Sequence, residues 1–368
     1  MSVRKIGVEE ELLLIDPRTR QLTAVSESAV AAHAEPVAVT QELFLEQIET
    51  STPPCTTGTE LLAALRAGRR AVGEAAAAAG ARAVATATHP LTGDSENVTR
   101  QGRYQRIHAL GGETSRQSLL CAMHAHVDIR DQDEGVAVID RLRPWLPVLL
   151  AISANSPYWV GRETSYASWR SQVISRWPTA GSAEAFDTVD GYRQVVARMQ
   201  AWGAALDPGM LYFDVRLAER YPTVEVRVAD VCTDLEDALL VVLLTRGLVD
   251  TCAELADLAP DFATDRWRSD LLRVATWRAA RFGAVGDIVH PVKAELAPFR
   301  TVLEDTIEFV RPALEASDDI DDVTALAGRL LNRGGGATRQ RRVYERTSSL
   351  TAVVDDLADR TEDSWMSS

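Results

Sequence analysis

Three well-separated segments alternate charged and apolar residues, and this alternation constrains the fold more than any other feature of the chain. The segments are residues 7–11, 123–128 and 223–228. Burying so many charges is costly unless cations and anions neutralise one another. The pattern predicts three strands that line one basin, and such a basin is suited to metal ions and a nucleotide phosphate. Because side chains two positions apart share one face of a β-strand, the groups expected on a common face are Glu9 with Glu11, His124 with His126 and Asp128, and Glu225 with Arg227.

The composition fits a globular enzyme and disfavours a nucleic-acid partner. The chain has 368 residues, of which 46% are hydrophobic and 25% are charged, ordinary usage for one large domain or two smaller ones. Its formal net charge of -14 argues against a nucleic-acid surface, because such binding depends on Lys and Arg displacing counterions from phosphates. A nucleotide bound to so acidic a chain would need metal ions and a few placed arginines around its phosphates.

Cysteine usage and hydropathy indicate a cytoplasmic protein. The first predicted strand begins within a few residues of Met1, which leaves no room for a signal peptide. The longest apolar stretches, near residues 145–154 and 238–244, are shorter than the ~20 residues of a membrane span, so we expect no membrane association. A reducing compartment is indicated by four cysteines that are far apart and form no CxxC pair, namely Cys55, Cys121, Cys232 and Cys252.

Periodicity predicts strands in the first part of the chain and helices in the last. Residues 155–191 lack clear periodicity and are expected to border the site. This distribution predicts an α+β fold with an antiparallel sheet, built as a single domain over residues 1–368 with a helical C-terminal part from about 234. The expected strands cover residues 5–15, 43–50, 81–88, 119–130, 210–217 and 223–231, with 22–25 returning beside the first and the last two forming a hairpin. The expected helices cover residues 59–79, 134–153 with an interruption near Pro144 and Pro147, and 234 onward with breaks at Pro260, Pro291 and 334–336.

The familiar phosphate-loop and zinc-helix motifs are absent from the sequence. It contains no GxxxxGK[ST], no GxGxxG between a strand and a helix, and no HExxH, the patterns that would mark those sites. The only glycine run, residues 334–336, precedes Arg339, Arg341 and Arg342. These arginines could fold over a phosphate, or they could be solvated side chains on a flexible loop between helices.

Carboxylates are the stronger signal for ligand chemistry. Their oxygen atoms suit Mg²⁺ or Mn²⁺, a single imidazole is tolerated, and the scarcity of cysteine speaks against zinc. One acid, or one isolated pair, is more often a solvent-facing strand residue, but three charged strand segments together favour a metal site. The candidate ligands are Glu9, Glu11, Glu42, Glu49 and Glu225 with His124.

Several longer motifs carry a resemblance to a known family. They are GVEEEL at residues 7–12, a run from Glu42 that ends in QIETSTP at 47–53, CAMHAHV at 121–127, RPWLP at 143–147, SANSP at 153–157, YASWRSQ at 166–172 and TVEVR at 223–227. In these motifs, which follow the family's order over nearly the whole chain, the sequence resembles the glutamate-cysteine ligases of plants and many bacteria. That family, also called carboxylate-amine ligases, belongs with glutamine synthetase.

The resemblance implies a glutamine synthetase-like catalytic fold, with about six antiparallel strands bent into a cradle and covered by helices. ATP would bind at one end and the acid substrate at the other, with metal ions between them. His126 is similar to a family histidine near the nucleotide phosphates, although it could instead be a core imidazole hydrogen-bonded to Asp128. By position, the resemblance assigns one metal to Glu9, His124 and Glu225, a second to Glu11, Glu42 and Glu49, and the nucleotide to His126 and Arg227. Arg339 is a further nucleotide candidate because it follows the glycine run, not because of the resemblance.

The implied activity is an ATP- and Mg²⁺-dependent ligase that forms a γ-glutamyl amide through an acyl phosphate, with glutamate and cysteine as the expected substrates. Arg227, facing the transferred phosphoryl group, and Glu225 are the expected catalytic residues. Two alternatives stay open: a phosphotransferase of the guanidino-kinase type on the same cradle, and a non-catalytic nucleotide-binding relative. From the family tendency alone, the C-terminal helices are expected to support a homo-oligomer. Arg170, Trp169 and Gln172 either line the substrate pocket or form a structural loop.

Overall fold

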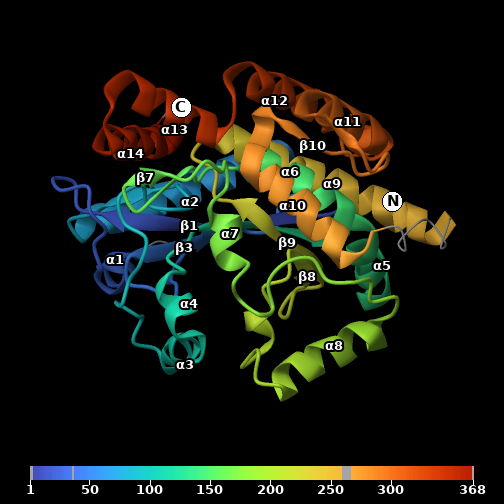
Figure 1. Ribbon diagram of the computed structural model, residues 1–368, viewed down its shortest axis with the longest axis horizontal. Helices are drawn as coiled ribbons and strands as arrows, with labels where there is room; N and C mark the ends of the chain where they lie inside the picture. Colours follow the sequence, from blue (N-terminus) through green and yellow to red (C-terminus); the bar gives the residue numbers. More distant parts are fainter. Residues whose placement is uncertain (1–2, 35–36, 259–266, 367–368) are drawn as a thin grey trace.

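An antiparallel sheet forms the centre of the molecule (Figure 1). The computed structural model describes residues 3–34, 37–258 and 267–366. The sheet has seven strands in the order β2-β3-β1-β5-β9-β8, with β4 paired to the free part of β1. Their bounds are β1 (Ile6–Ile15), β2 (Ala38–Gln41), β3 (Gln47–Ser51), β4 (Arg82–Val84), β5 (Ala122–Asp128), β8 (Val215–Leu217) and β9 (Thr223–Asp230).

The three charged segments lie on adjacent strands in the middle of this sheet. Glu9 of β1 is opposite His124 of β5, and His126 of β5 is opposite Glu225 of β9. A register irregularity between Met123 and Ala125 locally changes the pairing of β5 with β9, as a β-bulge does. The alternation in the sequence therefore predicts both the strands and their common charged face.

Helices cover the opposite face of the sheet. The alternate residues of β1 point to this face, where Val8 and Leu12 are buried in the main core. Glu10 points there too, and its carboxylate pairs with the guanidinium of Arg69 at 2.6 Å. Helices α2 (Gly58–Ala78), α6 (Leu146–Ser153) and α9 (Leu235–Leu258) pack against the strands. The predicted α+β fold, an antiparallel sheet covered by helices, is confirmed.

The remaining helices lie around this core, with α11 to α14 above the sheet in Figure 1 and α3, α4 and α8 below it. Within the described ranges, none of the helices combines the length and apolar character that a membrane span requires. The smaller helices before β9 are α1 (Ser26–Ala32), α3 (Gly102–Gly111), α4 (Glu113–Arg116), α5 (Gln132–Leu142), α7 (Arg170–Ile174) and α8 (Val189–Ala201). The C-terminal part contains α10 (Ser269–Phe282), α11 (Phe299–Ala316), α12 (Ile320–Arg333), α13 (Gly336–Thr347) and α14 (Leu350–Met366).

The structure differs from the predicted elements in several places. The strands expected over 81–88 and 210–217 are shorter, and only β4 and β8 form there. The strand expected over 43–50 is shorter and begins at Gln47, while an unpredicted edge strand, β2, precedes it. The segment 22–25 contributes one bridge, between Ile15 and Leu22, instead of a strand. A hairpin of β10 (Asp287–Val289) and β11 (Leu296–Pro298) interrupts the expected helical region around Pro291, and strands this short leave too few residues for a period to be recognised. Residues 155–191 hold the short strands β6 (Tyr158–Trp159) and β7 (Arg162–Glu163) as well as α7. The break expected at Pro260 lies outside the described residues.

Candidate active site

Glu9, His124 and Glu225 converge on the charged face of the sheet. One ligand atom from each lies within 4.8 Å of the others. The His124 Nδ1 is 3.2 Å from a Glu9 oxygen and 4.0 Å from a Glu225 oxygen. Burial, reinforced by the charge of Arg227, lowers the pKa of His124 to about 4. The imidazole is therefore neutral near pH 7 and has a nitrogen lone pair available for a metal ion.

Two arginines hold Glu225 in its charged form. Arg227 is bonded to one carboxylate oxygen, and Arg216 binds both oxygens at 2.7 and 3.1 Å. Burial opposes ionisation, but Arg227 and Arg216 outweigh it and hold the pKa of Glu225 well below its usual range. Arg216 was not among the predicted site residues. Its signal was the alternation of Tyr212, Asp214 and Arg216, which puts these residues on one face.

A second carboxylate group lies next to the first and has the opposite electrostatics. Glu11 is opposite Glu49 in the pairing of β1 with β3, and its carboxylate accepts a hydrogen bond from the Ala122 main-chain N–H at 2.7 Å. Burial and the charge of Glu42 raise the pKa of Glu11 to about 8. Burial also raises the pKa of Glu42, whose carboxylate is 3.3 Å from the Tyr104 hydroxyl, and it raises that of Glu49, with Glu42 adding to the shift.

These raised pKa values fit a site built for cations. Buried carboxylates that repel one another become favourable when a metal ion supplies the missing positive charge. The donor set consists of carboxylate oxygens with one imidazole nitrogen, which suits Mg²⁺ or Mn²⁺ and lacks the cysteine thiolates common in structural zinc sites. The residues on this face therefore fit the divalent cations that the sequence suggested.

His126 lies at the edge of the first group. Its Nδ1 is 3.0 Å from the Thr223 hydroxyl, and its Nε2 is 3.6 Å from a Glu9 oxygen. The Nε2 atom is buried and has no hydrogen-bond partner among the described residues. The alternative predicted for His126, a core imidazole hydrogen-bonded to Asp128, is not observed. The imidazole is hydrogen-bonded to the Thr223 hydroxyl instead.

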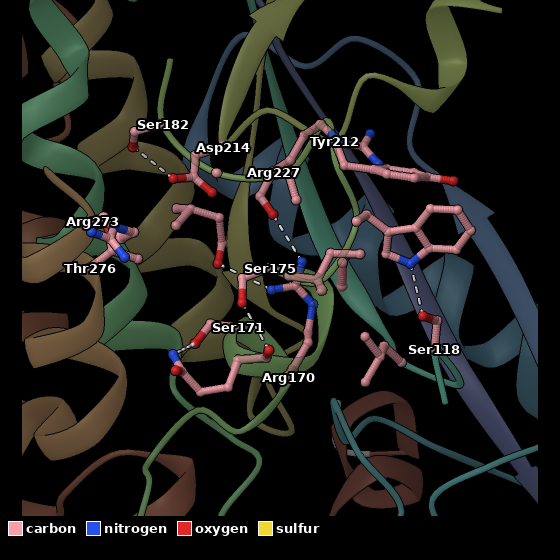
Figure 2. Close-up of a pocket in the computed structure, with 18 of the residues that line it drawn as sticks. Ser118, Arg170, Ser171, Ser175, Ser182, Tyr212, Asp214, Arg227, Arg273 and Thr276 are labelled. Atoms are coloured by element: carbon pink, nitrogen blue, oxygen red, sulfur yellow. Dashed lines mark hydrogen bonds between the residues drawn. The ribbon is translucent and has the colours of Figure 1, made fainter. Parts of the chain in front are cut away.

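His124 of the first group and Glu11 and Glu42 of the second lie in the wall of a cavity of about 800 Å³. Figure 2 shows Arg170, Tyr212 and Arg227 around it. Arg170 lines the cavity, but its guanidinium donates to the main-chain carbonyls of Arg227 at 3.0 Å and Val228 at 3.3 Å. The charged and amide side chains of this wall include Glu11, Glu42, Arg170, Gln172, Asp214, Arg227 and Arg273.

Trp169 and Arg339 are predicted site residues that do not line the cavity. Trp169 packs beside the cavity in a small apolar cluster with Leu120, Trp159 and Val173. Arg339 is not brought to this site at all. It lines a separate cavity of about 980 Å³ between α2, α9, α12, α13 and α14.

Arg339 cannot reach a phosphate at the sheet because acids of α9 and its N-terminal flank hold it. Its guanidinium is bonded to Asp234, and it lies 2.7 Å from an Asp237 oxygen. The arginines after the glycine run are neither free over a phosphate nor wholly solvated. Arg341 also has a partner, Glu163, at 2.8 Å.

Comparison with known proteins places the chain among ligases. A family model described as "Glutamate-cysteine ligase family 2(GCS2)" matches residues 5–359. A Nocardioides protein named "Putative glutamate--cysteine ligase 2-1" is 47% identical over 374 residues, covering 99% of this chain and 97% of its own. A Streptomyces avermitilis protein of the same name is 42% identical and covers 98% of this chain and 100% of its own.

A solved structure shows the same fold at low sequence identity. The glutamate-cysteine ligase of Francisella tularensis, determined in complex with AMP, has a TM-score of 0.65 with 14% identity, covering 100% of this chain and 94% of that one. The family match over nearly the whole chain and the close relatives agree with the cluster of carboxylates and imidazole on the sheet. The chain therefore belongs to glutamate-cysteine ligase family 2 and is a carboxylate-amine ligase.

Proposed function

We propose that the protein uses Mg²⁺ and ATP to join the γ-carboxylate of glutamate to an amine, with cysteine as the first candidate amine. The observation that carries this proposal is the convergence of Glu9, His124 and Glu225 beside Arg227 at one end of a large cavity. Transfer of the γ-phosphoryl group is mainly a problem of alignment and charge neutralisation. This end of the cavity supplies groups for both.

Two cation positions follow from the donor groups. Glu9, His124 and Glu225 would hold one metal ion, and the second would be held by Glu11, Glu42 and Glu49. When bound, the ions would neutralise the phosphate oxygens of the nucleotide. Mg²⁺ is the expected ion, and Mn²⁺ fits the same donors.

Arg227 is the residue best placed to act on the phosphoryl group itself. Its guanidinium is bonded to Glu225 and lies 3.4 Å from the His124 Nδ1, so it is held at the edge of the cation site. In the first step a substrate carboxylate oxygen attacks the γ-phosphorus of ATP, forming an acyl phosphate and releasing ADP. Arg227 would stabilise the charge that develops on the phosphoryl oxygens. In the second step the amine attacks the acyl carbon and phosphate leaves.

No side-chain nucleophile is needed for this chemistry, and the cysteines are poorly suited to be one. All four are free and buried. Burial raises the pKa of the Cys121 thiol, and the charge of Glu11 raises it further. A thiol in this environment stays protonated and unreactive. Free, buried thiols also fit our proposal that the enzyme acts on small molecules in the reducing cytoplasm.

The decisive test is a product analysis. Purified protein is incubated with Mg-ATP, glutamate and a panel of amines that includes cysteine, and both ADP and product mass are measured. We expect ADP to form with one or more amines, together with a product whose mass equals glutamate plus amine minus water. ADP release that never depends on an amine, with a phosphorylated product, would instead identify a phosphotransferase. Mg-ATP binding by calorimetry without ADP release in any mixture would identify a non-catalytic nucleotide-binding relative, and a lack of Mg-ATP binding would refute the proposed function.

A further inference from the structure

Asp214 is a carboxylate in the wall of the active-site cavity that the steps above do not use. It immediately precedes β8 and is labelled with Ser182 in Figure 2. The Ser182 hydroxyl donates a hydrogen bond to one Asp214 oxygen at 2.8 Å. Among the described residues, no Arg, Lys or His nitrogen lies within ion-pair distance of this carboxylate.

Few groups compensate the charge of Asp214. Burial raises the pKa of its carboxyl, and only the Ser182 hydrogen bond and the more distant charge of Arg170 act against this. An ionised carboxylate can accept about four hydrogen bonds, and a buried one is costly without partners. The structure therefore leaves acceptor capacity on Asp214 for a group that enters the cavity.

Asp230 shows what a structural buried aspartate looks like in the same protein. Its two oxygens accept hydrogen bonds from the Asn155 main-chain N–H, the Ser156 hydroxyl and the Ser168 hydroxyl. Arg170 adds a positive charge 3.5 Å away. Asp230 is saturated by the protein and Asp214 is not, which points to a ligand as the missing partner.

A positive group lies in the same cavity wall. Arg273 of α10 lines the cavity and has no carboxylate partner in the described part of the chain. In Figure 2 it lies on the same side as Ser182 and Asp214, and Ser118 lies on the other side. Arg170, which the sequence left as either a pocket residue or part of a structural loop, already donates to two main-chain carbonyls. Arg273 is therefore the better candidate to bind a substrate carboxylate.

We infer that Asp214, oriented by Ser182, receives the α-ammonium group of the amino acid whose side-chain carboxylate is activated, and that Arg273 receives its α-carboxylate. This inference rests on the proposed function, because it assumes that the cavity holds an amino acid whose far carboxylate extends toward Arg227. An acid without an α-ammonium group would leave the half-buried Asp214 carboxylate without a cationic partner, and a site built for a polar group rejects analogues that lack it.

The test crosses two variants with three acids. Glutamate carries both α-groups, glutarate lacks the ammonium group, and 4-aminobutanoate lacks the α-carboxylate. The ratio of kcat/KM values between acids is measured with Mg-ATP and an accepted amine. We expect Asp214→Asn to reduce the preference for glutamate over glutarate by roughly 10- to 100-fold, the range for one charge-assisted hydrogen bond. The preference of the Asp214→Asn variant for glutamate over 4-aminobutanoate should stay as in the wild type. Arg273→Met should reduce the preference for glutamate over 4-aminobutanoate and keep the preference for glutamate over glutarate.

Two further variants control for indirect effects. Asp207→Asn also removes an acidic charge, but Asp207 pairs with Arg103 at 2.7 Å and is not in the cavity wall, so the acid preference should not change. Ser182→Ala removes the hydroxyl that orients Asp214 and should weaken the preference for glutamate over glutarate in the same direction. This second variant decides the question if Asp214→Asn does not fold.

Direct binding separates this inference from the proposed function. Calorimetry is done with glutamate, Mg²⁺ and a non-hydrolysable ATP analogue. Glutamate binding that Asp214→Asn weakens, in a protein that forms no amide, would support the inference and refute the ligase proposal. If the wild-type protein does not bind glutamate, or if Asp214→Asn and Ser182→Ala both keep the wild-type preference for glutamate over glutarate, the inference is wrong.

Discussion

The two faces of β1 carry adjacent glutamates in opposite electrostatic situations. On the helix-covered face, Glu10 and Arg69 form a closed pair, with side-chain exposures of 1% and 0%, and Arg69 also donates to the main-chain carbonyls of Cys232 and Thr233. On the cavity face, Glu11 lies near Glu42 and Glu49, and its pKa is raised. Each charge on the helix-covered face, called the closed face below, has a protein partner. On the cavity face, called the open face, the acids are in excess. Matched charges hold the fold together, and unmatched charges indicate where a ligand binds.

The largest expected effect tests the closed face. Glu10→Gln leaves the Arg69 guanidinium buried without its counter-charge, and breaking a buried pair in this way costs ~3–5 kcal/mol. Chemical denaturation of the metal-free protein should show this loss in the free energy of unfolding. The matched variant Glu11→Gln, one position along the same strand, should show no loss. A comparable loss in both variants would contradict the distinction between the two faces.

A change on the open face should act on turnover instead of stability. Arg227→Lys keeps the positive charge but loses the planar fork that binds two partners at once. We expect kcat to fall roughly a hundredfold, as when one transition-state donor is removed, with a much smaller change in the dissociation constant of ATP. Steady-state kinetics and calorimetry with Mg-ATP measure the two quantities. Equal losses in both would mean that Arg227 only binds the nucleotide.

Metal binding at the open face should stabilise the folded protein, and this stabilisation should not depend on the ion pair of the closed face. Mg²⁺ at a hundredfold excess over its dissociation constant stabilises a protein that binds it only when folded by about 2.7 kcal/mol. Thermal unfolding should show this shift for the wild type and for Glu10→Gln. Glu9→Gln should reduce it, because Glu9 contributes a ligand oxygen to the cluster with His124 and Glu225. An unchanged shift in Glu9→Gln would place the ion elsewhere.

The charged face could be predicted from the sequence because the period of a strand is short and local. Alternation in β1, β5 and β9 is enough to say which side chains share a face, and the pairing then brings Glu9 opposite His124. The position of Arg339 could not be predicted, because it depends on how α13 packs against the acids around the start of α9. Asp214 precedes a strand of only three residues, β8, and its missing partner is visible only when the cavity wall is assembled.

The smallest expected effect concerns the pH dependence of the open face. Burial, and next to it the charge of Glu42, raise the pKa of Glu11 to about 8, against 4.5 for an ordinary glutamate. Between these two pH values the folded protein keeps a proton that the unfolded chain has lost, so this group makes stability fall as the pH rises from about 4.5 to about 8 and adds no further slope above that. Glu11→Gln removes this slope.

The metal-free variant should therefore be more stable than the metal-free wild type at pH 8 and equally stable near pH 4.5. Denaturant titrations at the two pH values, with a chelator present, measure the difference. Saturating Mg²⁺ should reverse the order at pH 8, because the wild-type carboxylate then has a cation as its partner and the amide does not. If Glu11→Gln has the same effect at both pH values, with and without Mg²⁺, then the acids on this face are not in excess, and the contrast between the two faces of β1 does not mark a cation site.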